Sequence, residues 1–453
     1  MHRIIFRADA GRDTGYGHFI RSLALADMLK EDYECMIYTQ APTEYQMREA
    51  EGVCPLVPLP ADDSRFGLFL DCLKGDETVV LDNYFYTAEY QQAIRDKGCL
   101  LVMIDDIHDR EFRADAIISP CLGDASAYDV RPGTPFCLGP RWALLRRPFL
   151  EKAAASGRRG CVVAFGGSDP HDLSSKFAGS LSGRTQVTIL AGERWEGKVP
   201  DGVTVRRGLD AKGVAELLRS AEDVCCSASS ICYEALACGA RVHAGWYVDN
   251  QREFYGTLAS KGLIDPLGDL RDGIAPLCGT APATDMAFDG VRQRYRQFFR
   301  ALSLRPVAYA DMTVEQSRKV WEARNAGDVR KWMSNPEEFS LESHMAFVES
   351  LRSRSDRMYF AFFDGGNFAG SCDLVDIAGG RASRGLFVSS AYRGRGVAMA
   401  METYIGCVAA GMGVHTLTAE VLKDNARSAA FHLKAGYVQS AEDDRYQYYT
   451  RSL

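Results

Sequence analysis

Over about its first 300 residues, the sequence alternates short apolar, β-branched runs with segments that have the spacing of amphipathic helices. Apolar strands separated by helices are typical of a parallel sheet that is covered on both faces, so this pattern predicts a doubly wound α/β fold. The first set of predicted strands is Arg3–Ala8, Cys35–Thr39, Thr78–Asp82 and Leu100–Asp105, and its predicted helices include Phe19–Lys30 and Ala88–Lys97.

The pattern restarts after Pro148 and changes near Leu304. Predicted strands of the second set are Cys161–Phe165, Val187–Ala191, Val203–Arg206, Val224–Ser227 and Val242–Trp246, with helices at Asp172–Leu181, Lys212–Ser220 and Ile231–Cys238. After the amphipathic stretch Val291–Leu302, two helical pieces precede the antiparallel-type strands Tyr359–Phe363, Phe368–Val375 and Gly385–Val388. We therefore expect two Rossmann-like halves, 1–148 and 149–303, and an α+β domain over 304–453, which agrees with roughly 150 residues per domain.

The charge balance and the cysteines exclude several classes of function. The formal net charge of -7, from 53 Lys and Arg against 60 Asp and Glu, gives no basic field for nucleic acid or for an anionic membrane. There is no secretory signal and no apolar run near the roughly 20 residues that span a bilayer, so we expect a cytoplasmic protein. The 14 cysteines are scattered, and the group Cys225, Cys226, Cys232 and Cys238 lacks the paired spacing of a zinc site, so no metal is expected.

The first candidate site is the loop RADAGRDTGYGHFIR, Arg7–Arg21, which joins a predicted strand to a predicted helix. Gly15 and Gly17 permit a tight turn, and His18 falls at the start of the helix. The positive end of the helix dipole favours the neutral imidazole, which is the form that takes a proton from water. The alternative is a histidine that only caps the loop.

Two further loops have the composition of diphosphate sites. Gly166-Gly167-Ser168-Asp169 follows a predicted strand, and Ser227-Ala-Ser-Ser230 leads into a helix that carries Glu234 in its second turn. Backbone N–H groups at such a helix start bind phosphates, and Glu234 can accept both ribose hydroxyls of a nucleotide. A purely structural glycine turn and an ordinary serine cap are the alternatives.

Together these loops resemble a known family. The segments RADAGRDTGYGHFIRSLALA, LDNYFY, IDDIHDR, LGPRWALLRRPF, FGGSDP, SASSICYEAL and DNQ are similar, in this order, to the UDP-sugar hydrolase of pseudaminic acid biosynthesis. That family removes UDP from 2,4-diacetamido-2,4,6-trideoxy-β-L-altropyranose and has the two-Rossmann glycosyltransferase-B fold. The resemblance covers roughly residues 1 to 300 and implies a metal-free reaction in which water takes the place of a sugar acceptor.

The resemblance also implies roles for individual residues. His18 corresponds to the group that activates water, with Tyr84 and Asn250 lining the sugar site. The residues implied to contact the UDP-sugar are Gly17, Gly166, Gly167, Ser229, Ser230, Glu234 and Gln251. Asp82, Asp105 and Asp106 stand at predicted strand ends, where they either cap helices and orient the site or, in another enzyme, hold a divalent cation; we favour capping and orientation.

The last third of the chain has a signature of its own. A strand is followed by R-x-x-G-x-A and a helix, which surrounds a diphosphate with backbone N–H groups as coenzyme A requires. This layout resembles the GNAT acetyltransferases over residues 304–453, and Trp321-x-x-Arg324 is similar to the acetyltransferase of the same pseudaminic acid pathway. The implied acetyl-CoA contacts are Arg393, Gly394, Arg395, Gly396, Val397, Ala398 and Asn425; solvated loop charges are the alternative for the two arginines.

One position departs from the GNAT pattern. Many of these enzymes have a tyrosine that protonates the leaving thiolate, and His432 occupies its place here. A protonated imidazole, near its ordinary pKa of about 6.5, can serve as this acid; a histidine on the helix surface is the alternative. The expected protein is therefore a bifunctional enzyme that takes a UDP-amino-sugar and acetyl-CoA. A glycosyltransferase fused to an acetyltransferase and a nucleotide-sugar-binding regulator are the other hypotheses, and the oligomeric state stays open.

Overall fold

The computed structural model describes residues 2–11, 15–151, 157–166, 169–192, 195–273, 277 and 288–453. The chain divides into two compact units. The first comprises Met1–Arg110, Ile118–Gly123 and Leu138–Arg292, and the second comprises Glu111–Ile117, Asp124–Cys137 and Gln293–Leu453. Within the described ranges, no helix has the length and apolarity that crossing a bilayer requires.

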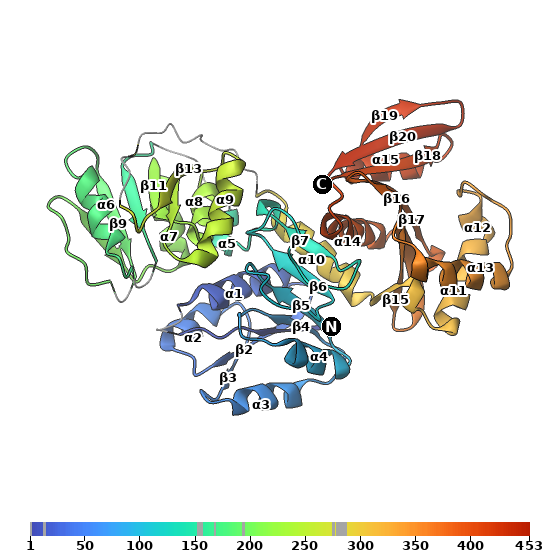
Figure 1. The fold of residues 1–453 in the computed structure, drawn as a ribbon, viewed down its shortest axis with the longest axis horizontal. Helices are drawn as coiled ribbons and strands as arrows, with labels where there is room; N and C mark the ends of the chain where they lie inside the picture. Colours follow the sequence, from blue (N-terminus) through green and yellow to red (C-terminus); the bar gives the residue numbers. More distant parts are fainter. Residues whose placement is uncertain are drawn as a thin grey trace. The chain divides into compact units, whose positions relative to one another are not determined.

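The first sheet has the strand order β3-β2-β1-β4-β5-β6-β7, and β1 to β5 pair in parallel. Ile4, Ile5 and Phe6 of the interior strand β1 are almost fully buried, because helices cover the sheet (Figure 1). Its strands are β1 Arg3–Arg7, β2 Glu34–Gln40, β3 Leu56–Leu59, β4 Thr78–Leu81, β5 Leu100–Ile104, β6 Ala116–Ser119 and β7 Phe136–Leu138. The accompanying helices are α1 Gly17–Leu29, α2 Glu44–Ala50, α3 Ser64–Cys72 and α4 Ala88–Asp96.

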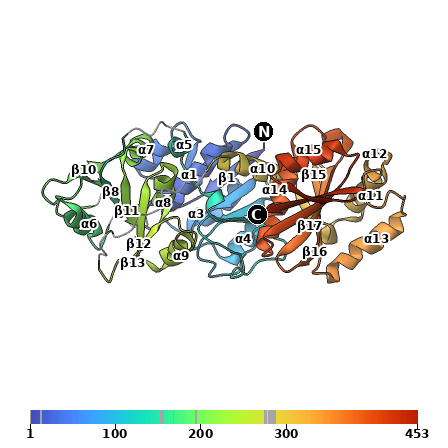
Figure 2. The ribbon, with the colours of Figure 1, turned by 90° about the horizontal axis from the view of Figure 1, so that it is seen from above.

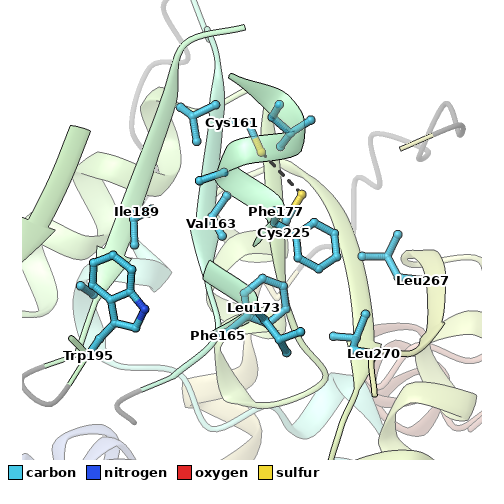
Figure 3. Close-up of a cluster of buried hydrophobic side chains, with 14 residues drawn as sticks. Cys161, Val163, Phe165, Leu173, Phe177, Ile189, Trp195, Cys225, Leu267 and Leu270 are labelled. Carbon is cyan, nitrogen blue, oxygen red and sulfur yellow. Dashed lines mark hydrogen bonds between the residues drawn. The ribbon is translucent and has the colours of Figure 1, made fainter. Parts of the chain in front are cut away.

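The second sheet is parallel throughout, with the order β10-β9-β8-β11-β12-β13. Figure 3 shows one of its cores, in which the rings of Phe165 and Phe177 stack and the sulfur atoms of Cys161 and Cys225 lie 3.6 Å apart. The strands are β8 Cys161–Ala164, β9 Val187–Ala191, β10 Thr204–Arg207, β11 Asp223–Ser227, β12 Arg241–Trp246 and β13 Asp265–Asp269. The helical segments are η1 Pro140–Trp142, α5 Arg147–Leu150, α6 Leu173–Leu181, α7 Ala211–Ser220, α8 Ser230–Ala237, η2 Asp249–Gln251 and α9 Arg252–Ser260.

The third sheet is mixed, with the order β14-β15-β16-β17-β18-β20-β19. Strands β14 to β17 are antiparallel neighbours, whereas β17 and β18 run parallel. Figure 2 shows these orange to red strands with helices α11 to α15 around them. The strands are β14 Pro306–Ala308, β15 Met358–Asp364, β16 Asn367–Ala378, β17 Arg381–Val388, β18 Thr416–Leu422, β19 Val438–Glu442 and β20 Tyr446–Ser452. The helical segments are α10 Val291–Ser303, η3 Tyr309–Asp311, α11 Val314–Asn325, α12 Gly327–Arg330, α13 Leu341–Ser350, η4 Leu351–Ser353, η5 Ser390–Tyr392, α14 Val397–Gly411 and α15 Ala426–Lys434.

The fold class expected from the sequence is confirmed: two Rossmann-like parallel sheets precede an α+β domain. The domain boundaries at 148 and 303 stay predictions. Residues 111–117, 124–137 and 293–303 belong to the second compact unit, although the sequence pattern assigns them to the Rossmann-like halves. Interleaving of this kind has no periodic signal in a sequence, because it depends on which core each short segment joins.

Candidate active site

A cavity of about 300 Å³ lies within the first unit, and both parallel sheets contribute to its lining. The contributing loops follow β4, β5, β6, β11 and β12, which is the carboxyl edge where open α/β sheets bind ligands. The lining residues are Gly17, His18, Arg21, Tyr84, Asp106, Pro120, Cys121, Leu144, Ala228, Ser229, Ser230, Tyr233, Val248, Asn250, Gln251 and Phe254. The structure therefore brings together seven predicted site residues: Gly17, His18, Tyr84, Ser229, Ser230, Asn250 and Gln251.

His18 lies in the first turn of α1, and a buried carboxylate fixes its ring. The Nδ1 atom is 2.7 Å from Oδ1 of Asp82, whose side chain is fully buried. Burial alone would raise the pKa of Asp82, but Arg21 and His18 outweigh it and hold that pKa below its ordinary value. An ionised carboxylate only accepts hydrogen bonds, so this contact favours the tautomer that carries the hydrogen on Nδ1 and leaves Nε2 as the basic ring nitrogen. The structure thus favours the orienting role that we expected of Asp82.

Arg21 joins the two carboxylates of the site, one helical turn after His18. Its Nε and Nη2 donate to Asp82 at 2.7 and 2.6 Å, and its Nη1 donates to Asp106 at 2.9 Å. The hydroxyl of Tyr84 donates to the other oxygen of Asp106 at 2.7 Å, and burial raises the pKa of that hydroxyl. Arg21 therefore fixes His18 through Asp82 and Tyr84 through Asp106. The sequence reasoning missed Arg21, because its spacing from His18 does not reveal its partners.

A second buried network supports the same loops. The Asp9 backbone N–H donates to Oδ1 of Asn83 at 2.6 Å, and the Asn83 amide donates to the Asp9 carbonyl at 2.9 Å. The Asp9 carboxylate accepts hydrogen bonds from fully buried Arg7 and from the Gln40 backbone. These bonds tie the loop after β1 to the loop after β4, which carries Tyr84. The cavity wall is therefore anchored to the sheet on this side.

The opposite wall of the cavity has the features of an anion site. Ser229 is the N-cap of α8, and among the described residues this helix start has no side-chain cap hydrogen bond. Uncapped N–H groups at a helix start favour a negatively charged ligand. Gly166 lies at the end of β8 with φ of +89°, a conformation that suits glycine, but it is outside the cavity lining. Gly167 lies outside the described residues.

Glu234, the predicted acceptor of the ribose hydroxyls, has a protein partner in the structure. Its carboxylate is buried and bonded to Arg146, whose Nε and Nη2 lie 2.9 and 2.8 Å from Oε1. Burial raises the pKa of Glu234, and Arg146 counteracts that rise. Arg146 belongs to the LGPRWALLRR stretch, 88 residues earlier in the chain, so no local pattern reveals the pair. The contact of Glu234 with ribose stays a prediction. The sequence reasoning did not foresee that Arg146 is bonded to Glu234.

In the second unit, the predicted coenzyme loop has the backbone of an anion nest. Gly394 and Gly396 have φ of +76° and +79°, and Gly396 caps α14 without a side-chain hydrogen bond. Arg393 lies 2.6 Å from Asp328 and also donates to the Val388 carbonyl, so it is more than a solvated loop charge. Val397 and Ala398 form the first turn of α14.

Asn425 caps α15, because its Oδ1 accepts from the Ser428 N–H at 3.0 Å. This contact gives the residue a structural role in the described chain. Its predicted contact with coenzyme A stays a prediction.

His432 is not the surface residue that one alternative supposed, since only 3% of it is exposed. Its Nδ1 donates to the Ser428 carbonyl at 2.7 Å, and its ring stacks on Tyr449. Burial, together with the charge of Arg384, lowers the pKa of His432 to about 4. This pKa lies below the ordinary value of about 6.5 on which the acid role was argued, so less of the imidazole is protonated at pH 7 than that argument needs. Its buried Nε2 has no hydrogen-bond partner among the described residues, and in the neutral ring this atom is a hydrogen-bond acceptor.

Comparison with known proteins separates the chain into two homologous parts. The family described as Acetyltransferase (GNAT) domain matches residues 301–438. The UDP-2,4-diacetamido-2,4,6-trideoxy-beta-L-altropyranose hydrolase of Campylobacter jejuni is 24% identical over 280 residues, which cover 57% of this chain and 97% of the hydrolase. The acetyltransferase PseH of Campylobacter jejuni is 24% identical over 135 residues, 30% of this chain and 85% of PseH.

Two further comparisons cover smaller shares. The uncharacterized protein MJ1062 of Methanocaldococcus jannaschii is 21% identical over 299 residues, 60% of this chain, and the match spans only 61% of its length. A crystal structure of Campylobacter jejuni PseH in complex with acetyl coenzyme A aligns with 33% of this chain and 97% of that chain, at 20% identity and a TM-score of 0.27.

The C-terminal part of the chain is thus a GNAT acetyltransferase domain. The part before it is homologous to the hydrolase, so both resemblances inferred from the sequence are confirmed.

Proposed function

We propose that the protein catalyses two consecutive steps on one UDP-sugar. The GNAT domain transfers the acetyl group of acetyl-CoA to the 4-amine of UDP-4-amino-4,6-dideoxy-N-acetyl-β-L-altrosamine. The N-terminal unit then hydrolyses the product, UDP-2,4-diacetamido-2,4,6-trideoxy-β-L-altropyranose, to the free sugar and UDP. The names of the hydrolase and PseH relatives support this pairing of reactions.

The pair His18–Asp82 at the cavity is the observation that carries the hydrolase proposal. Asp82 holds Nδ1–H, so Nε2 can take a proton from water as the water oxygen bonds to the anomeric carbon. The bond between that carbon and the diphosphate oxygen breaks, and UDP leaves with the electron pair. After product release, the proton on His18 returns to solvent.

The leaving UDP needs positive potential, and α8 provides it. The uncapped N–H groups after Ser229 border the same cavity as His18. Each contact with a helix dipole is worth about 0.3–1 kcal/mol at a surface, so several donors must act together. Asn250 and Gln251 of η2 line the wall beside them and are suited to bind the sugar or the diphosphate.

The acetyltransferase proposal rests on the GNAT family and on the nest at Gly394 and Gly396. Successive backbone N–H groups in this conformation bind a diphosphate such as that of coenzyme A. Among the described residues, no group of three or more His, Cys, Asp or Glu is arranged to hold a metal ion. We propose that both reactions proceed without a metal.

The decisive experiment supplies the purified protein with the UDP-4-amino sugar, with and without acetyl-CoA, in H₂¹⁸O. The proposal expects CoA release, a sugar mass increase by one acetyl group, and UDP release with ¹⁸O in the sugar. Label in UDP would instead indicate attack at phosphorus. UDP release that depends on an added acceptor would indicate a glycosyltransferase, and binding without turnover would indicate a regulator.

A further inference from the structure

The GNAT sheet opens between β17 and β18. These strands pair only where residues 381–383 meet residues 416–418, although β17 continues to Val388 and β18 to Leu422. Beyond Ser383, the β18 side of β17 is an open edge that leads toward the coenzyme loop at Arg393–Gly396. An extended acyl-CoA arm can hydrogen-bond along such an edge, since in the described chain β18 pairs with β17 only up to Ser383. The reacting thioester is therefore expected beside the first residues of this edge.

Asp373 of β16 lies beside this position. It is the register partner of Gly385, the second residue of the open edge. A Cβ atom built on Gly385 would lie 2.5 and 2.7 Å from the two carboxylate oxygens of Asp373. The carboxylate thus occupies the space that a side chain at Gly385 would fill, and Asp373 remains partly exposed. Gly385 does not have a positive φ, so the space and not the backbone conformation requires glycine there.

Asp373 has charged and polar neighbours, but none of them forms an ion pair with its carboxylate in the described part of the chain. In the described part of the chain, no cation lies within ion-pair distance of Asp373, although Arg324 and Arg384 act on it from farther away. Burial raises the pKa of Asp373 to about 6, against the lowering effect of these arginines and of the Gly385 N–H. The titratable and charged groups that act on or beside it are Tyr309 of η3, Arg324 of α11, Arg357 before β15, Tyr359 of β15, Cys372 of β16 and Arg384 of β17.

Arg324 adds an unsatisfied donor to the same region. Its Nη1 atom is buried and has no hydrogen-bond partner among the described residues. Burial lowers the pKa of this guanidinium, while Tyr309, Asp373 and Tyr359 raise it. A buried donor without a partner is costly, so a bound acceptor with an oxygen at this position would remove the cost. A carboxylate and a free guanidinium donor together suit a ligand that carries both an amine and oxygen atoms.

We propose that Asp373 binds the acceptor ammonium group and takes its proton during acetyl transfer, and that Arg324 donates a hydrogen bond to an oxygen of the same amino sugar. The proposal rests on the acetyl transfer proposed above. One ammonium proton passes to Asp373, and the nitrogen lone pair forms the C–N bond. The C–S bond then breaks, the second proton goes to the departing sulfur as CoA–SH, and Asp373 returns its proton to solvent.

His432 cannot take the ammonium proton in place of Asp373, because it lies at the other face of the sheet. Arg384 and Gly385 are consecutive on β17, so their side chains point to opposite faces. Arg384 contacts Tyr437, whose ring packs edge-on against His432, whereas Asp373 lies over Gly385. The two candidate proton-transfer groups therefore flank the open edge from opposite sides.

The test compares acetyl transfer to the UDP-4-amino sugar in the wild type and in Asp373→Asn. We expect kcat to fall by about 10²–10⁴-fold, as loss of a general base does, with an unchanged Kd for CoA. The unchanged Kd shows that the domain is folded. The wild-type rate should also fall below pH 6, where Asp373 becomes protonated, and Asp373→Asn should lack this acidic limb. Asp376→Asn, which alters an exposed carboxylate on the same strand, is the matched control and should keep the wild-type rate.

Gly385→Ala provides an independent variant, because its methyl group displaces the Asp373 carboxylate while Asp373 stays present. We expect a reduced kcat, and no further reduction when Gly385→Ala is added to Asp373→Asn, since both changes act through one carboxylate. Additive losses would overturn the proposal. So would a wild-type rate in Asp373→Asn, an equal loss in Asp376→Asn, or a loss confined to Glu420→Gln on β18, which would move the base to that strand.

The experiment distinguishes a wrong substrate assignment from a wrong role for Asp373. If the wild type does not acetylate the UDP-4-amino sugar, the function proposed above is wrong, and the same variants are compared on a panel of other amino sugars and their nucleotides. Loss of transfer to whichever amine is acetylated supports Asp373. Absence of transfer to every amine overturns both proposals.

Discussion

At the scale of single residues, the proposed hydrolase site depends on how the charged side chains of the cavity are paired. Asp82 and Asp106 are both bonded to Arg21, so neither carboxylate repels a departing diphosphate as a bare anion would. Asp82 also fixes the tautomer of His18. A histidine that is oriented by a buried carboxylate on one nitrogen can act as a base through the other.

The first prediction concerns His18. We expect His18→Ala to lower the rate of UDP release by about 10²–10⁴-fold, because the group that receives the water proton is lost. Acetyl transfer should continue at the wild-type rate, since the GNAT site belongs to the other compact unit. UDP and CoA release are measured on the same samples, and exposed His415→Ala is the control. Near-normal hydrolysis in His18→Ala would refute the assignment.

The second prediction concerns His432. A pKa of about 4 leaves this imidazole largely neutral at pH 7, so we expect that it does not donate the proton to the thiolate. We therefore expect the rate of acetyl transfer to show no alkaline limb near pH 6.5, and His432→Gln to keep whatever alkaline limb the wild type has. The pH profiles of kcat for both proteins provide the measurement. A limb near 6.5 that disappears in the variant would restore the acid role that the sequence suggested.

At the scale of helices and strands, sequence patterns locate elements well and their tertiary partners poorly. The strand predicted at Val187–Ala191 has these same bounds in the structure, because its apolar run ends at clear turn residues. The edge strand β7 was missed because its three residues carry no periodicity. The edge strand β13 was missed because its sequence, Asp-Pro-Leu-Gly-Asp, has the composition of a turn. For the site, the loops after β1 and β11 were identified from glycine and serine spacing. The Arg146–Glu234 pair and the burial of His432 were not, because both depend on residues that are remote in sequence or hidden by packing.

The third prediction concerns β11, β12 and β13, which a buried histidine joins. His243 is bonded through Nε2 to Asp223 at 2.9 Å and through Nδ1 to Asp265 at 2.8 Å. Burial lowers the pKa of His243, but the two carboxylates outweigh burial and raise it above 6.5. Because the pKa in the folded state exceeds that in the unfolded state, the stabilisation is fully present below about pH 6.5 and is lost as the pH rises through the higher value.

This stabilisation is measured as the difference in unfolding free energy between the wild type and His243→Gln. The difference should shrink when the pH is raised from 6 to 9. Hydrogen exchange of β11 to β13 provides the local readout, because the first unit contains two sheets and need not unfold in one step. A difference that is constant over this range would show that His243 does not carry a proton in the folded protein.

At the scale of the whole molecule, the chain contains two backbone arrangements that suit an anionic ligand. A helix start at Ser229 and a glycine nest at Gly396 each present backbone N–H groups, in separate compact units. Main-chain N–H groups of this kind favour negative charge and leave the neighbouring side chains to choose the ligand. The two substrates proposed above, a UDP-sugar and acetyl-CoA, both carry a diphosphate that such groups can bind.

The fourth prediction is that hydrolysis continues in excess EDTA. The carboxylates of Asp82 and Asp106 are the nearest candidates for a cation, and both are already bonded to Arg21. Arg21 and the start of α8 supply the positive potential that a metal ion would otherwise provide. UDP release is followed before and after chelation. Loss of activity that Mg²⁺ restores would reject the metal-free mechanism.

The last prediction concerns the fusion of the proposed hydrolase and acetyltransferase parts in one polypeptide chain. Gly396→Val should weaken acetyl-CoA binding by about tenfold or more, because valine is strained at φ of +79° and the nest is distorted. His18→Ala is expected to lose the hydrolysis that releases UDP. When the two variants are mixed, the acetylated UDP-sugar made by His18→Ala can diffuse to the intact hydrolase site of Gly396→Val. We expect overall conversion to return, at a rate that rises with protein concentration, because the link raises only the local concentration of the intermediate. Absence of conversion in the mixture, with each remaining single activity intact, would show that the intermediate is passed on within one chain.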